Sequence, residues 1–355
     1  LFGKYSTDDL KQFRQWQSVT PGHPELDVKR GIENTSGPLG QGHTNGVGAA
    51  IAERFLSTKF GEWMSHKIYC FISDGGIQEE ISQGAGRIAG YLGLNNLIMF
   101  YDANKVQLST MVDQVTTEDT AKKYEAWGWH VITINGNDPD EIRGALLKAN
   151  EEKEKPFLII GETTMGLGAL TEDGKSFEAR VSTHGQPLSK AGASVPKTIR
   201  NLGGDPENPF AVFPEVEKYY RNSIALKKEY VAEKRKQFRE WQVNNPEKAA
   251  GLRKILTNEV PEVDYASISL KANSATRAAS SAVLGAFSGN VENMIVISAD
   301  LSNSDKTEGF LKNTKPLSHK NFEGAFLHAG VSELTMAAMA NGMALHNIIP
   351  VCGSF

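Results

Sequence analysis

Two polar residues that follow neighbouring apolar runs could do chemistry together. Asp74 follows the run Ile68–Ile72, and Asn104 follows the run Leu97–Tyr101. A helix-like segment over 79–94 separates the runs, so they form one βαβ unit with parallel, adjacent strands. Ligands bind at the carboxyl ends of such strands, where a carboxylate and an amide oxygen suit a hard cation that also binds phosphate oxygens. The pair predicts a metal–diphosphate site; on spacing alone, ordinary turn residues are the alternative.

Three other segments carry groups suited to ligand binding. The turn Thr20–Glu25 presents the imidazole of His23, and the Gly-rich loop 36–42 leads into a helix expected over 45–60. Such a loop allows the backbone to approach a ligand closely. Glu333 begins a helix-like segment, where a carboxylate can also serve as a simple helix cap. Each segment alone is a weak signal.

The first half of the chain has the pattern of an α/β fold. Strand-like runs alternate with helical patterns, which indicates a parallel sheet covered by helices. The expected strands are 67–73, 96–102, 130–135 and 156–162, and the expected helices between them are 79–94, 117–127 and 139–150. The segment 161–187 is rich in Gly, Ser and Thr, and we expect a long loop there, of a length that is often functional.

The second half begins with a charged helical segment over 213–255, which we interpret as a solvated linker rather than a binding patch. Pro261 closes this segment, and a second α/β pattern follows. Its expected elements are helices at 275–287 and 332–346, a strand at 294–298 and a further strand that begins at 348. A chain of 355 residues is therefore expected to hold two domains, or one domain and a large part of another.

Composition excludes several classes of partner. The net charge is −4 and there is no long basic stretch, so we expect no nucleic acid partner. No apolar run reaches membrane-spanning length, so we expect no membrane partner. Both cysteines, Cys70 and Cys352, lie in or beside expected buried strands. A disulfide framework is therefore implausible, and we expect a reducing, cytoplasmic location.

Taken together and in order, these segments resemble the transketolases, a family of thiamine-diphosphate enzymes. The matching segments are Thr20–Glu25 (TPGHPE), Gly37–Gly42 (GPLGQG), Ser73–Gly75 (SDG for GDG), Phe100–Asn104 (FYDAN), Thr183–Gly185 (THG), Ala275–Arg277 (ATR), Ser298–Leu301 (SADL) and Gly330–Glu333 (GVSE for GVRE). The resemblance runs from about residue 9 to residue 355. So many ordered matches are specific, whereas any one of them is not.

The resemblance implies a site for thiamine diphosphate with Mg²⁺ or Ca²⁺. Asp74 and Asn104 would ligate the metal, helped by the backbone carbonyl of Val106. The residues that would line or contact the cofactor site are Gly37, Leu39, Gly75, Glu79, Asp300, Leu301 and Phe355. Among them, Phe355 would stack on the aminopyrimidine ring, and Glu79 would couple the two sites of a dimer.

The resemblance also implies roles in the reaction. Glu333 would share a proton with ring nitrogen N1′ of the cofactor, which activates it. His23 and His184 would handle protons at the hydroxyl groups of the donor sugar. Arg277 and Ser304 would bind the phosphate of the sugar, for which an arginine offers a planar fork of donors.

The implied activity is that of a transketolase in the pentose phosphate pathway. It would transfer a two-carbon ketol unit from a ketose phosphate to an aldose phosphate through a covalent thiamine adduct. The implied assembly is a homodimer with active sites at the subunit interface. Two alternatives stay open: another ketol- or acyl-transferring thiamine enzyme, and a non-catalytic protein that only binds the cofactor. A nucleotide-dependent dehydrogenase is disfavoured, because no G-x-G-x-x-G follows the first strand.

By the same resemblance, residues 1–212 correspond to the diphosphate-binding (PP) domain, 213–260 to a helical linker, and 261–355 to the first part of the pyrimidine-binding (Pyr) domain. The family has catalytic histidines that would precede Leu1, and further sequence that would follow Phe355. We therefore expect the chain to be the interior of a longer protein, incomplete at both ends. Expressed alone, it is expected to be inactive and prone to aggregate.

Overall fold

Four of the apolar runs form a parallel sheet whose carboxyl edge carries Asp74 and Asn104. The computed structural model describes all 355 residues, and its first sheet has the order β1-β2-β4-β3. Its strands are β1 (Ile68–Ser73), β2 (Leu97–Ala103), β3 (His130–Asn135) and β4 (Phe157–Glu162). Ile72 of β1 is in register with Tyr101 of β2. The expected parallel pairing of β1 with β2 is confirmed.

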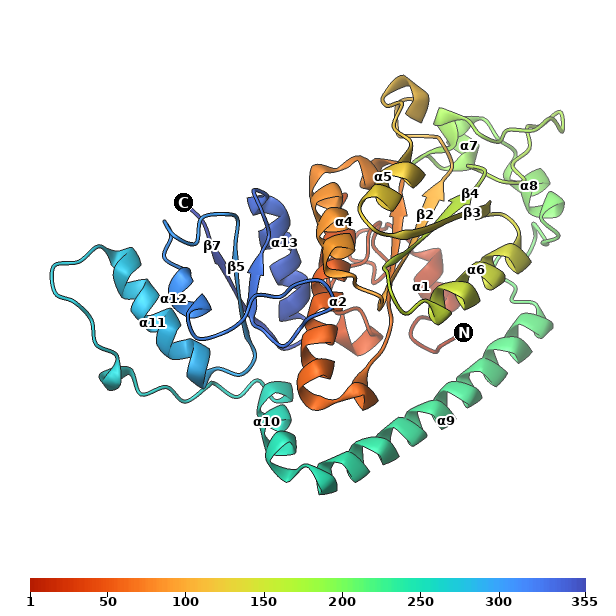
Figure 1. Cartoon of the computed structure of the whole chain (residues 1–355). Helices are drawn as coiled ribbons and strands as arrows, with labels where there is room; N and C mark the ends of the chain where they lie inside the picture. Colours follow the sequence, from red (N-terminus) through yellow and green to blue (C-terminus); the bar gives the residue numbers. More distant parts are fainter.

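Side chains that alternate along β2 enter different cores on the two faces of this sheet, as the period of a strand requires. Met99 and Tyr101 enter the main core, which also contains residues of α2 (Gln41–Phe60) and α4 (Glu80–Leu92). On the other face, Ile98 packs in a smaller cluster with α6 (Pro139–Glu151). Helices therefore lie on both faces of a buried parallel sheet (Figure 1).

The helix expected over 79–94 forms as α4, and a further short helix that the sequence did not predict comes before it. A short helix, α3 (Asp74–Gln78), precedes α4, and Glu79 between them has a non-helical backbone with ψ 132°. The Gly-rich loop packs on this break, because a Cβ atom at Gly40 would lie 2.8 Å from the Cβ of Glu79. Asp74 therefore opens a helix, rather than standing in a simple turn after the strand.

The remaining elements of the first half are short. They are α1 (Thr7–Lys11), α5 (Thr120–Ala126), α7 (Leu188–Ala191) and α8 (Val195–Asn201), with the 3-10 turns η1 (Val28–Arg30), η2 (Glu62–Met64), η3 (Val112–Gln114) and η4 (Val181–Thr183). Residues 163–180 contain neither helix nor strand, as expected for the long loop.

A long helix, α9 (Pro214–Asn244), runs along the outside of the molecule and continues after a break into α10 (Pro246–Leu256) (Figure 1). None of the residues of α9 is buried. Its C-terminal part is attached by aromatic contacts, in which Phe238 stacks on Trp63 with ring centroids 4.9 Å apart. The charged helical pattern therefore forms a solvated helix, as expected.

A second, smaller parallel sheet has the order β6-β5-β7. Its strands are β5 (Met294–Ser298), β6 (Phe326–His328) and β7 (Ile349–Gly353), with α11 (Thr276–Asn290), α12 (Glu308–Leu311), α13 (Glu333–Ala344) and the turn η5 (Tyr265–Ser267). The expected α/β character of both halves is confirmed. No helix of the structure combines the length and apolar character needed to cross a membrane.

The two sheets are joined through a close crossing of α2 and α13 (Figure 1). Glycines permit this approach: a Cβ at Gly48 would lie 2.0 Å from the carbonyl oxygen of Met339, and one at Gly342 would lie 2.0 Å from that of Asn45. One core cluster of 37 buried residues includes side chains from both halves. The position of Glu333 is thereby fixed relative to the first sheet.

His43, in the first turn of α2, is only 2% exposed, and neither of its ring nitrogens has a hydrogen-bond partner. Burial lowers the pKa of His43 from 6.5 to about 4, because an apolar environment disfavours the charged ring. Between these pH values the unfolded chain binds a proton that the native protein does not. The stability linked to His43 is therefore complete above pH 6.5 and is lost as the pH falls toward 4.

Replacing His43 by leucine should make the fold less sensitive to acid. Between neutral pH and the native pKa of His43, the free energy of unfolding should fall by up to about 3 kcal/mol less in the variant than in the wild type. Urea unfolding at both pH values measures this difference. The variant His328→Leu, at an exposed position, is the control and should behave as the wild type. An equal loss in His43→Leu and the wild type would contradict the assignment.

Candidate functional site

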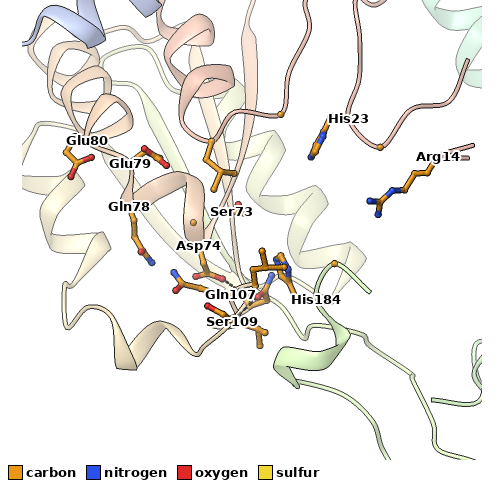
Figure 2. Close-up of a pocket in the computed structure, with 18 of the residues that line it drawn as sticks. Arg14, His23, Ser73, Asp74, Gln78, Glu79, Glu80, Gln107, Ser109 and His184 are labelled. Carbon is orange, nitrogen blue, oxygen red and sulfur yellow. Dashed lines mark hydrogen bonds between the residues drawn. The ribbon is translucent and has the colours of Figure 1, made fainter. Parts of the chain in front are cut away.

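A pocket of about 1020 Å³ lies at the carboxyl ends of β1 and β2 (Figure 2). Separate segments of the first half line it: the N-terminal turn, the Gly-rich loop, α3 with the start of α4, the turn after β2, and the long loop after β4. The predicted residues that it brings together are His23, Gly37, Leu39, Asp74, Gly75, Glu79, Asn104, Val106 and His184. Segments far apart in the sequence therefore converge on one site.

The carboxylate of Asp74 is buried in the wall of this pocket, with 2% of the residue exposed. Its Oδ1 accepts a hydrogen bond from the hydroxyl of Tyr101 at 2.6 Å, and its Oδ2 accepts from the backbone N–H groups of Asn104 (3.1 Å) and Lys105 (3.0 Å). Burial raises the pKa of Asp74 above its usual value, although these hydrogen bonds act in the opposite direction. Burial likewise raises the pKa of Tyr101, so its hydroxyl is a donor at neutral pH.

The turn after β2 supplies further oxygen atoms. Lys105 has a left-handed backbone with φ 65°, and the side-chain Oδ1 of Asn104 accepts the N–H of Val106 at 3.0 Å. No group of three His, Cys, Asp or Glu side chains that could hold a metal is present in the chain. The predicted set is of another kind, since it has one carboxylate, one amide oxygen and one backbone carbonyl. Such a set suits a hard cation whose other ligands are phosphate or water oxygens.

Two glycines keep the pocket open next to Asp74. A Cβ at Gly37, where φ is 144°, would lie 3.0 Å from the ring of His23, and a Cβ at Gly75 would lie 3.1 Å from Leu39. Side chains at either position would therefore press on the residues that line the pocket. Bare backbone at these places lets a ligand approach the strand ends closely.

The two histidines differ in environment. His23 is exposed on the N-terminal turn, whereas His184 is half-buried and its Nδ1 is enclosed without a hydrogen-bond partner. Figure 2 shows His23 and Arg14 on one side of the pocket and Glu79 and Glu80 on the other. Both imidazoles nevertheless belong to the lining of the same pocket.

The charges of the pocket call for a cation beside any anionic ligand. Three carboxylates line it, those of Asp74, Glu79 and Glu80, whereas Arg14 is its one permanently charged cation. A diphosphate next to Asp74 would face like charge in a partly buried setting, which is unfavourable unless a metal ion neutralises both. The residues present therefore fit a diphosphate only together with a divalent cation.

The candidate residues of the second half lie outside this pocket, all of whose lining residues fall within 14–185. Glu333 is the first residue of α13, and Asp300 follows β5 with φ 65°. The guanidinium of Arg277 donates to the backbone oxygen of Ser304 at 3.2 Å, so these two candidates are neighbours. The remaining two are Leu301, which is partly exposed, and Phe355, which is 80% exposed.

The helix that carries Glu333 is fixed against α4 of the same chain. Arg87 of α4 donates to the carbonyl oxygen of Ala329 at 2.9 Å, just before this helix. A Cβ at Gly84 would lie 2.4 Å from the hydroxyl oxygen of Thr335. The start of α4 is in the pocket and its next turn holds α13, so the two sets of candidates are linked through one helix.

Sequence reasoning missed several residues of the site. The pocket also contains Arg14, Gln15, Gln78, Glu80, Gln107, Leu108 and Ser109, and Tyr101 holds Asp74 from below. Arg14 lies near the pocket because its backbone N–H donates to the carbonyl oxygen of Thr20. No periodic sequence pattern predicts this contact. Tyr101 had a usable signal: a hydroxyl in a strand that enters an apolar core needs a partner.

Comparison with known proteins identifies the family. The domain described as "Transketolase, thiamine diphosphate binding domain" matches residues 2–261, and "Transketolase, pyrimidine binding domain" matches residues 272–355. This chain belongs to the transketolase family. The resemblance indicated by the motifs is thereby confirmed, and the pocket lies in the thiamine-diphosphate-binding region of the family.

Similar transketolases occur in bacteria and eukaryotes. Transketolase 1 of Pasteurella multocida is 37% identical over 368 residues, which cover 99% of this chain and 53% of that protein. The transketolase of Streptococcus pyogenes is 35% identical, with 98% and 47% covered. The chain thus spans about half the length of the curated transketolases that it matches.

Solved transketolases share the fold. That of Leishmania mexicana superimposes with a TM-score of 0.91 at 33% identity, over 99% of this chain and 52% of that chain. That of Pichia stipitis in complex with sedoheptulose 7-phosphate gives a TM-score of 0.88 at 31% identity, over 98% and 52%. These similarities confirm the expected α/β fold class.

Replacing Gly40 by alanine should disturb the Gly-rich loop of this transketolase site. Gly40 has φ 78°, and a Cβ there would lie 2.8–2.9 Å from atoms of Glu79, Ile81 and Ser82. We expect the free energy of unfolding to fall by about 1–3 kcal/mol, and thiamine-diphosphate affinity to weaken. Thermal unfolding and calorimetry measure both.

The matched control is Gly42→Ala, two residues along in α2. A Cβ at Gly42 has no atom within 4 Å, and its backbone is helical. This change should be neutral or stabilising by up to about 1 kcal/mol. Equal behaviour of the two variants would show that the Gly40 contacts do not shape the pocket.

Proposed function

We propose that the chain is the cofactor-binding part of a thiamine-diphosphate-dependent transketolase. The enzyme would transfer a two-carbon ketol unit from a ketose phosphate to an aldose phosphate, a reaction of the pentose phosphate pathway. The observation that carries the proposal is the single pocket in which Asp74 and Asn104 lie with His23 and His184. Family membership over nearly the whole chain supports it.

In this proposal, Asp74, Asn104 and the carbonyl of Val106 hold Mg²⁺ or Ca²⁺. The cation neutralises the buried Asp74 carboxylate and the diphosphate together, so that neither remains an unpaired buried charge. The bare backbone at Gly37 and Gly75, with the side chain of Leu39, lines the cofactor. The oxygen-rich donor set favours these hard cations over zinc.

The imidazoles act at the sugar end of the pocket. When bound, thiamine diphosphate supplies a nucleophilic ring carbon that takes up the two-carbon unit. His23 and His184 are placed to accept and return protons at the hydroxyl groups of the sugar. The place of both histidines in the lining of the pocket supports this role.

A second copy of the chain would complete the site. The pocket contains no residue of the Pyr region, yet Glu333, Asp300, Leu301 and Phe355 are the candidates for binding the cofactor ring. Val331 and Leu334 flank Glu333 and are 77% and 70% exposed, an apolar surface suited to an isologous interface. In the resulting homodimer, Glu79, just before α4, would lie between the two sites.

Arg277 and Ser304 are proposed to bind the phosphate of the sugar. The bond from the guanidinium to the backbone of Ser304 holds both residues at one place on the second half. The similar Pichia stipitis transketolase was solved with sedoheptulose 7-phosphate, which supports a sugar phosphate as substrate. The boundaries 1–212, 213–260 and 261–355 remain our proposed division into PP domain, linker and Pyr domain.

A product assay tests the proposed function. The protein at its natural length, supplied with thiamine diphosphate and Mg²⁺, should convert xylulose 5-phosphate and ribose 5-phosphate into sedoheptulose 7-phosphate and glyceraldehyde 3-phosphate. Release of acetyl phosphate in the presence of inorganic phosphate would indicate a phosphoketolase instead. Cofactor binding without any turnover would indicate a protein that only binds thiamine diphosphate.

Replacing Asp74 by alanine should abolish metal-dependent binding of thiamine diphosphate, because the buried diphosphate would lose its counter-ion. Calorimetric titration of the full-length protein with the cofactor and Mg²⁺ measures the affinity, and the chelated wild type is the reference for metal-free binding. An unchanged affinity in Asp74→Ala would rule out the assigned metal site.

Replacing Glu333 by glutamine should slow activation of the cofactor more than its binding. Glutamine keeps the size of the side chain but cannot share a proton in the same way. We expect the C2 hydrogen of bound thiamine diphosphate to exchange with deuterium about 100-fold more slowly, the scale of a lost proton-transfer partner. Quenched-flow NMR measures the exchange; a wild-type rate would leave Glu333 as a helix cap only.

A further inference from the structure

The carboxylate of Asp74 is held entirely by β2 and the turn that follows it. One of its oxygens accepts only from the hydroxyl of Tyr101, and the other accepts from the backbone of Asn104 and Lys105. The two backbone donors are neighbours on one turn, and both donate to the same oxygen, Oδ2. The orientation of the second oxygen depends on a single side chain.

Tyr101 is itself rigidly placed. It lies on β2, a central strand, in register with Ile72 of β1 and Ile160 of β4, and only 7% of it is exposed. Its ring belongs to the main core, and its hydroxyl donates to the Asp74 carboxylate at 2.6 Å from beneath the pocket lining. A donor anchored in this way sets the direction of the carboxylate plane.

We propose that Tyr101 is a positioning residue that orients Asp74 for the divalent cation. The inference rests on the metal site of the proposed function and adds to it a residue that does not line the pocket. A hydrogen bond to a ligating carboxylate fixes its rotamer before the metal arrives. A carboxylate oxygen that accepts one hydrogen bond keeps a lone pair for a cation.

A purely structural role predicts a different result. If the bond only satisfied a buried carboxylate, loss of the hydroxyl would lower stability and leave the metal affinity of the folded protein unchanged. A positioning role predicts instead that the metal affinity of the folded protein falls, because the metal binds the carboxylate in its preformed orientation. Loss of such an outer partner typically weakens metal binding about 10–100-fold.

The experiment measures Mn²⁺ affinity by electron paramagnetic resonance in the full-length protein with thiamine diphosphate present. The test variant is Tyr101→Phe, which removes only the hydroxyl. The matched control is Tyr124→Phe, because Tyr124 is a fully buried tyrosine of the same core whose hydroxyl has no hydrogen-bond partner. Near-ultraviolet circular dichroism gives the folded fraction of each variant, and affinities are referred to it.

We expect the Mn²⁺ dissociation constant to rise about 10–100-fold in Tyr101→Phe and to change by less than about twofold in Tyr124→Phe. Introduced into an Asp74→Asn background, Tyr101→Phe should have no further effect, because the oriented group is already altered. Equal affinities in Tyr101→Phe and Tyr124→Phe would overturn the inference.

The Asp74→Asn variant alone separates this inference from the function on which it rests. If its Mn²⁺ affinity equals that of the wild type, the metal site itself is wrong and the inference falls with it. If Asp74→Asn weakens binding but Tyr101→Phe does not, the metal site stands and only the positioning role is lost. A crystal structure of metal-free Tyr101→Phe gives a second readout, in which the Asp74 carboxylate should rotate away from its native direction.

Discussion

The burial of one carboxylate governs the architecture of this site. Asp74 is 2% exposed at the end of β1, and a buried carboxylate is stable only when its charge is matched or its oxygens are hydrogen-bonded. Tyr101 of the adjacent strand and the turn at Asn104 and Lys105 supply the hydrogen bonds. A divalent cation shared with a diphosphate would match the charge. The parallel pairing of β1 with β2 is what brings the carboxylate and its donors together.

The crossing of α2 and α13 is the second constraint, because it fixes the orientation of the two halves of the chain relative to each other. Gly48 and Gly342 allow backbone contact that larger residues would prevent. With α13 held against α4, Glu333 stands at the surface while the pocket opens from the first half alone. In the proposed homodimer, the second copy of the chain would add a further surface to each pocket.

Much of this arrangement could be predicted from the sequence, because parallel pairing follows from a βαβ pattern. That pattern places Asp74 beside Asn104 whatever the rest of the chain does. Local rules also explain why α3 was not predicted: Gly75 and Gly76 have poor helix propensity. The same parallel pairing of the two strands places Tyr101 near Asp74.

Other features depend on contacts that no local pattern encodes. Arg14 reaches the pocket because an irregular N-terminal segment folds back on the turn at Thr20, and irregular backbone has no period to read. His23 and His184 could be assigned to one site only through the resemblance, since they lie 161 positions apart in the sequence. The contact of Gly48 and Gly342 with the opposite helix could not be predicted, because the sequence of an apolar helix does not indicate which other helix it packs against.

The most direct test of the metal–diphosphate site is a crystal structure of the full-length protein grown with thiamine diphosphate and Mn²⁺, with anomalous diffraction to locate the metal. The account predicts one anomalous peak per chain, at coordination distance from the side-chain oxygens of Asp74 and Asn104 and the carbonyl oxygen of Val106, and bridged to the diphosphate. A peak elsewhere, or a diphosphate bound without any metal contact to Asp74, would contradict it.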